Sequence, residues 1–317
     1  MANLVETANW EETVNLLSTS DAVMGGADGP PNVQARQLAN RTRYLKEHLD
    51  AVEEGDLSEA AGLAELVEAY GASQILGSEL NANTDDADND IDFSAGSCLA
   101  ANGAVLLKSS STVTKKKDLT WAAGHDAGGL FSGANVSNNG TLHCFRIGTT
   151  DGTIDHGFDD NPTCDNLPTG FTYYRRLGSR RLDGSGHLIP MIQTGNLNEY
   201  KTFINDAYLT GSTTASLVSL STPEGIKIKA NIIAFCNDNF SLTYQPYGLI
   251  TNPALEDAAP THLINNFATR RTSSDFPWTR VDMQVLTNTA HQIRIRFNHA
   301  LPLFGITTKG WVDDRSV

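Results

Sequence analysis

The chain has 317 residues, of which 40% are hydrophobic and 19% charged, and its formal net charge is -14. This length allows two or three structural units with a large core, and the acidic balance excludes the phosphate attraction that drives nucleic-acid binding. No apolar run approaches the roughly 20 residues of a membrane span, and the acidic start MANLVETANWEE does not resemble a signal peptide. We therefore expect no nucleic-acid partner, no membrane insertion and synthesis in a cytoplasm.

The first expected element is a helix that begins at the proline pair 30–31, after a glycine-rich turn at residues 25–29. Proline suits the first turn of a helix because the amide that it lacks would have no partner there. Apolar or small side chains then recur at a spacing of three and four, at Leu38, Thr42, Leu45, Leu49 and Val52. This stripe predicts either a seam between a few like helices or a helix packed on its own domain, since too few heptads are present to decide.

A second short helix is expected from Leu57 to Ala69, because Asp56 to Glu59 resembles a capping sequence ahead of a helical apolar pattern. Residues 71–90 are small, polar and acidic, which is typical of a linker. We therefore predict an attachment region with the first helix at 1–54, a second helix and linker at 55–87, and a head domain at 88–317.

The head is expected to be built of strands. Residues 226–232, 281–285 and 291–297 alternate apolar with polar side chains, and turn clusters such as 183–186 and 222–225 separate such segments. This rhythm favours a β-sandwich or jelly roll. We see no useful helix after residue 90 and no fixed repeat of the kind that a parallel β-helix would show.

Three groups of residues raise the question of metal binding or catalysis. The aspartates 85, 86, 88, 90 and 92 do not meet the calcium-loop motif, and His143, Cys144, His156 and Cys164 lack zinc-site spacing. The aspartates 151, 155, 159, 160 and 165 are plentiful but not visibly paired for glycoside hydrolysis, and no G-x-S-x-G elbow is present. We therefore predict no catalytic residues, no metal and no cofactor, and we expect Cys98, Cys144, Cys164 and Cys236 to be buried free thiols.

Arginines and aromatic residues offer candidate binding groups. Arg175, Arg176, Arg180 and Arg181 form the one dense basic cluster, which we interpret as structural, with an anion site for acidic sugars or phosphates as the alternative. Exposed aromatic faces suit contact with sugar or protein, and the loop-rich segment 237–278 is the expected receptor-facing region. Its candidate receptor-binding residues are Phe240, Tyr244, Tyr247, Phe276 and Trp278.

The N-terminal run resembles that of bacteriophage tail fibre and tailspike proteins. The matching positions are Trp10, Asp21, Val23, Gly25, Gly26, Gly29, Asn32, Leu38, Arg41, Thr42, Tyr44, Leu45 and Lys46. A second set of motifs resembles a head domain of phage and prophage tail fibres. It comprises DIDFSAG at 90–96, Thr114-Lys115 with DLTWAAG at 118–124, GGLFSG at 128–133, His143 with Phe145 and Ile147, LPTGFTYYRRLGS at 167–179 and TTKGWVDDR at 307–315.

The resemblance implies a homotrimer with a short helical stalk and a β-sandwich, jelly-roll-like head. It implies a virion tail fibre protein that attaches by its N-terminal region to tail or baseplate proteins and adheres by its head to a bacterial surface receptor, a polysaccharide or a protein. Two alternatives remain: a structural baseplate or fibre component that never touches the host, and a polysaccharide depolymerase.

Overall fold

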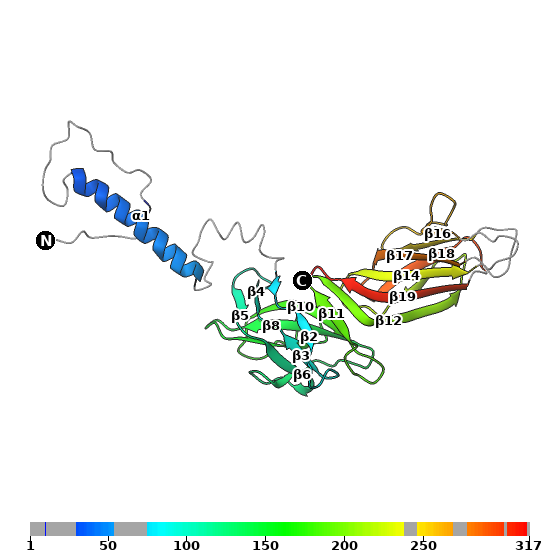
Figure 1. Ribbon diagram of the computed structural model, residues 1–317, viewed down its shortest axis with the longest axis horizontal. Helices are drawn as coiled ribbons and strands as arrows, with labels where there is room; N and C mark the ends of the chain where they lie inside the picture. Colours follow the sequence, from blue (N-terminus) through cyan, green and yellow to red (C-terminus); the bar gives the residue numbers. More distant parts are fainter. Residues whose placement is uncertain are drawn as a thin grey trace. The chain divides into compact units, whose positions relative to one another are not determined.

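The computed structural model describes residues 10, 30–53, 75–237, 246–268, 278–300 and 303–315. The chain divides into two compact units, one of residues 1–72 with 102–106 and one of residues 73–101 with 107–317. The described part of the first unit contains a single helix, and that of the second contains sheets (Figure 1). The protein is therefore mainly β, as the composition and turn pattern predicted.

Helix α1 (Pro30–Glu53) begins at the predicted proline pair. Two ion pairs at a spacing of four residues lie along its exposed surface, Arg43 to Glu47 at 2.9 Å and Lys46 to Asp50 at 2.5 Å. Each such pair adds only a few tenths of a kcal/mol to a helix. The glycine turn before α1 and the second helix expected at 57–69 lie outside the described residues.

A three-stranded and a seven-stranded sheet occupy the first part of the β unit. The smaller sheet has the order β1 (Ile75–Gly77), β4 (Gly96–Leu99) and β5 (Leu106–Ser109). The larger has the order β10 (Tyr173–Arg181), β8 (Thr141–Gly148), β9 (Ile154–Asp159), β7 (Ala127–Leu130), β6 (Val113–Thr120), β3 (Asp90–Phe93) and β2 (Leu80–Ala82). Its pairs are antiparallel except β6 with β7 and β7 with β9, which are parallel.

The prediction of a linker through residues 71–90 is wrong for residues 75–77 and 80–82, which form β1 and β2, and for Asp90, which opens β3. Leu80 explains the difference, because its side chain is fully buried and β2 pairs with β3 in the large sheet. Strands of three residues leave too little alternation to be recognised among small and acidic neighbours.

Two further sheets enclose one core. The five-stranded sheet has the order β11 (Met191–Thr194), β12 (Leu197–Thr210), β19 (Leu303–Val312), β14 (Lys229–Asn237) and β17 (Trp278–Leu286). The four-stranded sheet has the order β13 (Ser216–Ser219), β18 (Gln292–Phe297), β15 (Tyr247–Thr251) and β16 (Phe267–Ala268). Buried side chains of both sheets, among them Ile232, Ile306, Ile250 and Ile295, form a single hydrophobic cluster, which is the packing of a β-sandwich.

The alternating patterns at 281–285 and 291–297 correspond to β17 and β18. The strand expected at 226–232 begins later, at Lys229. The three residues before it follow the turn at Pro223–Gly225. Beyond the end of β17, the amide of Thr287 donates to the carbonyl of Ile228 at 3.0 Å, and the amide of Ile228 donates to the hydroxyl of Thr287 at 3.3 Å. The alternation predicted correctly which side chains of residues 226–232 face the core from position 228 on, since Ile228, Ala230 and Ile232 are all buried.

Candidate functional site

The predicted seam on α1 lies on an exposed face of the helix. Leu38, Leu45 and Leu49 are 49%, 58% and 59% exposed, and Thr42 between them donates its hydroxyl to the carbonyl of Leu38 at 3.0 Å. The side chain of Val52 lies outside the described ones. A stripe of leucines that keeps half of its surface in water is a surface that a partner helix can cover.

Trp10 lies against the same helix. Its ring is 5.8 Å from that of Tyr44, and the guanidinium of Arg41 lies 4.8 Å from its centroid. Both contacts join residues that carry the N-terminal resemblance, and the cation lies at the distance at which it is attracted to an indole face. The structure thus gives these residues a local packing role.

Of the predicted receptor-binding aromatics, Phe240, Tyr244 and Phe276 lie outside the described residues. Trp278 opens β17, although its side chain is not described, and Tyr247 opens β15 as a half-buried residue. Tyr247 pairs with Ala268, and Asn298 accepts a hydrogen bond from its backbone amide at 2.7 Å. Of the five side chains, only that of Tyr247 belongs to the described part of the chain.

A different aromatic pair lines an open groove on the five-stranded sheet. Tyr208 of β12 is 66% exposed, and its ring lies 5.9 Å from that of Phe235 on β14. Gly305 of β19 is the register partner of both residues. A Cβ at Gly305 would lie 2.0 Å from Cε1 of Phe235, so the glycine is what lets the ring lie across the strand between them.

The rest of the groove is polar. Its volume is about 390 Å³, and the lining residues besides the two aromatics are Asn205, Asp206, Ala207 and Thr307. Thr307 donates to the side-chain oxygen of Asn205 at 2.8 Å. Asn205 is exposed, and its side-chain NH2 group can donate hydrogen bonds to a ligand. Aromatic faces beside amide and hydroxyl groups are the combination that suits a sugar ring, with its apolar faces and equatorial hydroxyls.

Sequence reasoning did not single out Tyr208 or Phe235. Phe235 had a usable signal, because alternation through β14 places Ala230, Ile232 and Ala234 on the core side and Phe235 on the other. Tyr208 had no such signal, since β12 is bulged twice within its pairing with β19 and its exposure pattern is irregular.

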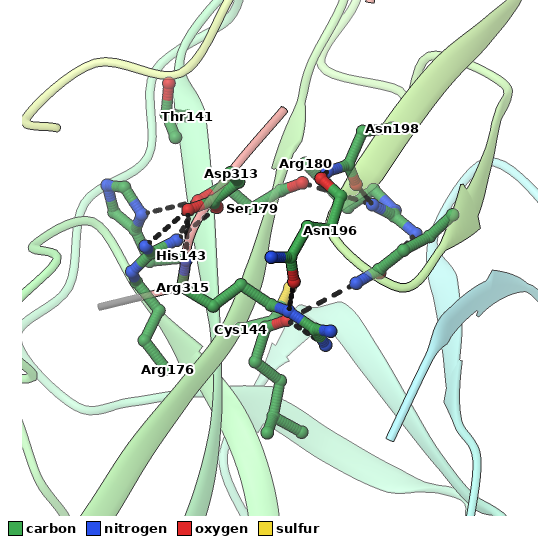
Figure 2. A network of polar contacts seen from close by, with 12 residues as sticks. Thr141, His143, Cys144, Arg176, Ser179, Arg180, Asn196, Asn198, Asp313 and Arg315 are labelled. Atoms are coloured by element: carbon green, nitrogen blue, oxygen red, sulfur yellow. Dashed lines mark hydrogen bonds and ion pairs between the residues drawn. The ribbon is translucent and has the colours of Figure 1, made fainter. Parts of the chain in front are cut away.

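The arginine cluster is buried and structural. Arg175, Arg176, Arg180 and Arg181 are each at most 6% exposed, so a sugar or phosphate at the protein surface does not reach them. The alternative of a surface anion site is therefore wrong. Arg176 forms a two-pronged ion pair with Asp313, at 2.6 Å and 2.8 Å, and donates to the hydroxyl of Ser179 at 3.2 Å (Figure 2).

The same network joins β10 to the end of the chain. The amide of Arg315 donates to Asp313 at 2.8 Å, and its Nε donates to Asn196 at 3.1 Å (Figure 2). Arg180 donates to Asn198 at 3.3 Å and to the carbonyl of Leu80. Burial would raise the pKa of Asp313, but the hydrogen bonds and charge of Arg176 lower it below its usual range.

The histidines and cysteines considered for zinc are core residues. His143 is buried and its Nδ1 lies 2.9 Å from the hydroxyl of Ser179, while His156 accepts a hydrogen bond from Arg146 at 3.0 Å. Burial, together with Arg176 nearby, lowers the pKa of His143 to about 3. All four cysteines are free and buried, as predicted, and the described residues contain no group of three or more side chains placed to hold a metal ion.

The carboxylates considered for hydrolysis stabilise turns and a buried cation. Asp155 pairs with the buried Lys115 at 2.9 Å and accepts the amide of Gly124. Asp159 accepts from Asn161 and Asn166, and Asp165 from Asn161 and Thr163. These three carboxylates thus have structural partners.

Comparison with known proteins returns neither a matching family model nor a matching curated protein. In the described part of the chain, no helix is long and apolar enough to cross a membrane.

Proposed function

We propose that the protein is a bacteriophage tail fibre protein that assembles as a homotrimer, attaches to tail or baseplate proteins through its N-terminal region and adheres to the host surface through its β unit. The motif resemblances suggest the class of protein. The observation that carries the proposal is the exposed leucine stripe of α1, which belongs to a different compact unit from the β head.

The stripe supports assembly by its energetics. Fully burying a leucine side chain contributes about 1.5 to 3 kcal/mol, so covering the half-exposed Leu38, Leu45 and Leu49 contributes about 1 kcal/mol each per chain. Most of the stability of a helix in a protein comes from packing of its apolar face rather than from its own propensity, and packing of this 24-residue helix against two copies of itself supplies that stabilisation. Three heads held together then adhere more strongly than one, because linked weak sites act at a high effective concentration.

For adhesion we propose the groove between Tyr208 and Phe235 and, as its ligand, a surface polysaccharide. The support is chemical: the lining contains the largely exposed phenol ring of Tyr208, the ring of Phe235, and an amide and a hydroxyl from Asn205 and Thr307. The jelly-roll-like topology remains part of this proposal. The loop aromatics at 240, 244 and 276 remain a second prediction for the same unit.

The test is binding of the intact chain to an array of bacterial surface polysaccharides, with Tyr208→Ala as the variant and Phe203→Ala as the control. Phe203 is a suitable control because it is an aromatic residue of the same strand, is 52% exposed and does not line the groove. Loss of one aromatic–sugar contact is expected to weaken binding about tenfold, with the control unchanged. An intact chain that binds no polysaccharide and no bacterial cell would favour the structural fibre component, and new reducing ends in the bound polysaccharide would favour the depolymerase.

A further inference from the structure

A second pocket, distinct from the groove, is lined by residues of β3, β6 and the loops beside them. Its volume is about 600 Å³. The lining residues are Asn83, Asp85, Asp86, Asp90, Thr114, Lys116, Asp118, Leu119, His125 and Asp126. Five carboxylates face one ammonium in this lining, so the pocket carries strong negative charge.

Most of the polar groups around the pocket are already engaged. Lys116 pairs with Asp126 at 2.9 Å. Asp86 accepts the amides of Asp88 and Asn89 and both of its oxygens accept the side chain of Asn89. These hydrogen bonds, that of the Asn89 side chain first, lower the pKa of Asp86 below its usual range, so this carboxylate stays charged beside the pocket.

Asp90 is the exception. Its residue is only 7% exposed, yet its carboxylate accepts no hydrogen bond and forms no ion pair within the described part of the chain. Burial, and then the charge of Asp86, raise its pKa above the usual range. The oxygens of Asp90 are not among the fully buried atoms without a partner, so the part of the side chain that reaches solvent faces the pocket that it lines. A cation that enters the pocket would give this carboxylate a charged hydrogen-bond partner.

The shape of the lining decides which cation fits. The described residues hold no group of three or more side chains close enough to coordinate a metal ion, whereas a hydrogen-bond donor needs only one or two convergent acceptors. A primary ammonium group carries three donors and a compact charge. A pocket of this size also admits the molecule that bears the ammonium, because small-ligand sites span about 300 to 1,000 Å³.

We propose that this pocket binds a primary ammonium group, with Asp90 as its charged acceptor. The group can belong to an amino sugar or to a lysine side chain of a partner protein, and both present the same chemistry to Asp90. The inference does not rest on the tail fibre proposal, since it uses a different sheet face and a different ligand group.

The test is titration of the intact chain with four probes, followed by calorimetry or ligand-detected NMR. Glucosamine and Nα-acetyl-lysine amide carry the ammonium group. N-acetylglucosamine and glucose have the same sugar ring as glucosamine but no charge. Asp90→Asn keeps the shape of the side chain and removes its charge. The control is Glu199→Gln, which removes one charge from an exposed position on β12.

We expect at least one ammonium probe to bind and both uncharged sugars to fail. Asp90→Asn should weaken that binding about tenfold or more, as removal of a charged hydrogen-bond partner does, and Glu199→Gln should leave it unchanged. Which ammonium probe binds more tightly then identifies the source of the group. Equal binding of glucosamine and N-acetylglucosamine, binding unaffected by Asp90→Asn, or binding of Ca²⁺ with no response to either ammonium probe would each overturn the proposal.

Discussion

Asp313→Asn is the substitution that most sharply tests the buried network of the β unit. Asp313 is 2% exposed and both of its oxygens accept hydrogen bonds from Arg176, a residue 137 positions earlier in the chain. Asparagine keeps the shape but removes the charge that pairs with the guanidinium of Arg176, a residue that is 1% exposed.

The expected loss of unfolding free energy is about 3 kcal/mol, because removing one partner of a buried ion pair costs about 3 to 5 kcal/mol and the amide retains one acceptor. The neighbouring Asp314 is exposed, so Asp314→Asn removes the same charge without the burial and should change stability by less than about 0.5 kcal/mol. Urea unfolding of the two variants and the parent chain, followed by the fluorescence of the buried Trp311, makes the comparison.

The reasoning fails if Asp313→Asn and Asp314→Asn unfold at the same urea concentration. A second variant separates charge from shape. Replacing the pair together, with Arg176→Met and Asp313→Leu, removes both buried charges at once and should unfold at higher urea than Asp313→Asn alone, because no unpaired charge remains.

Two further predictions concern the buried histidines and Gly305. Burial lowers the pKa of His143 to about 3 and that of His156 well below its usual range. In the unfolded chain both histidines take up protons near pH 6.5, whereas in the folded protein they stay neutral there. The free energy of unfolding should therefore be highest above about pH 6.5 and should fall below it by up to about 1.4 kcal/mol per pH unit for each histidine. Equal urea midpoints at about pH 7.5 and about pH 5 would contradict this. The Cβ of Gly305→Ala would lie 2.0 Å from Phe235, so we expect the free energy of unfolding to fall by about 1 to 3 kcal/mol from overpacking and polysaccharide binding to weaken. The control is Gly195→Ala, whose Cβ would meet open space. It should alter stability through backbone strain alone and leave polysaccharide binding intact.

Local pattern was enough to predict several elements of the fold. The proline pair located the start of α1, and period-two alternation located β17 and β18, because in both cases the signal lies within a few neighbouring residues. The same reasoning failed at β1 and β2, where Leu80 is the main apolar side chain that the short strands bury.

The candidate sites depend on contacts that no local pattern contains. The four arginines between Arg175 and Arg181 were interpreted as structural, but the sequence did not show their partners. Arg176 pairs with Asp313 near the end of the chain, and Arg180 donates to Asn198 on β12. Likewise the groove exists only because β19 pairs with both β12 and β14, which brings Gly305 between two aromatic residues that are 27 positions apart in the sequence. Pairing of distant strands therefore has to be known before either feature can be recognised.

The proposed function depends most directly on the association of three chains through α1. The molar mass of the protein in solution tests this association. Light scattering of the intact chain should give about three times the 34.2 kDa of one copy. Leu45→Glu with Leu49→Glu should reduce that mass to one copy, while Glu47→Gln on the opposite side of the helix should not. A parent chain with the mass of a single copy would contradict the account.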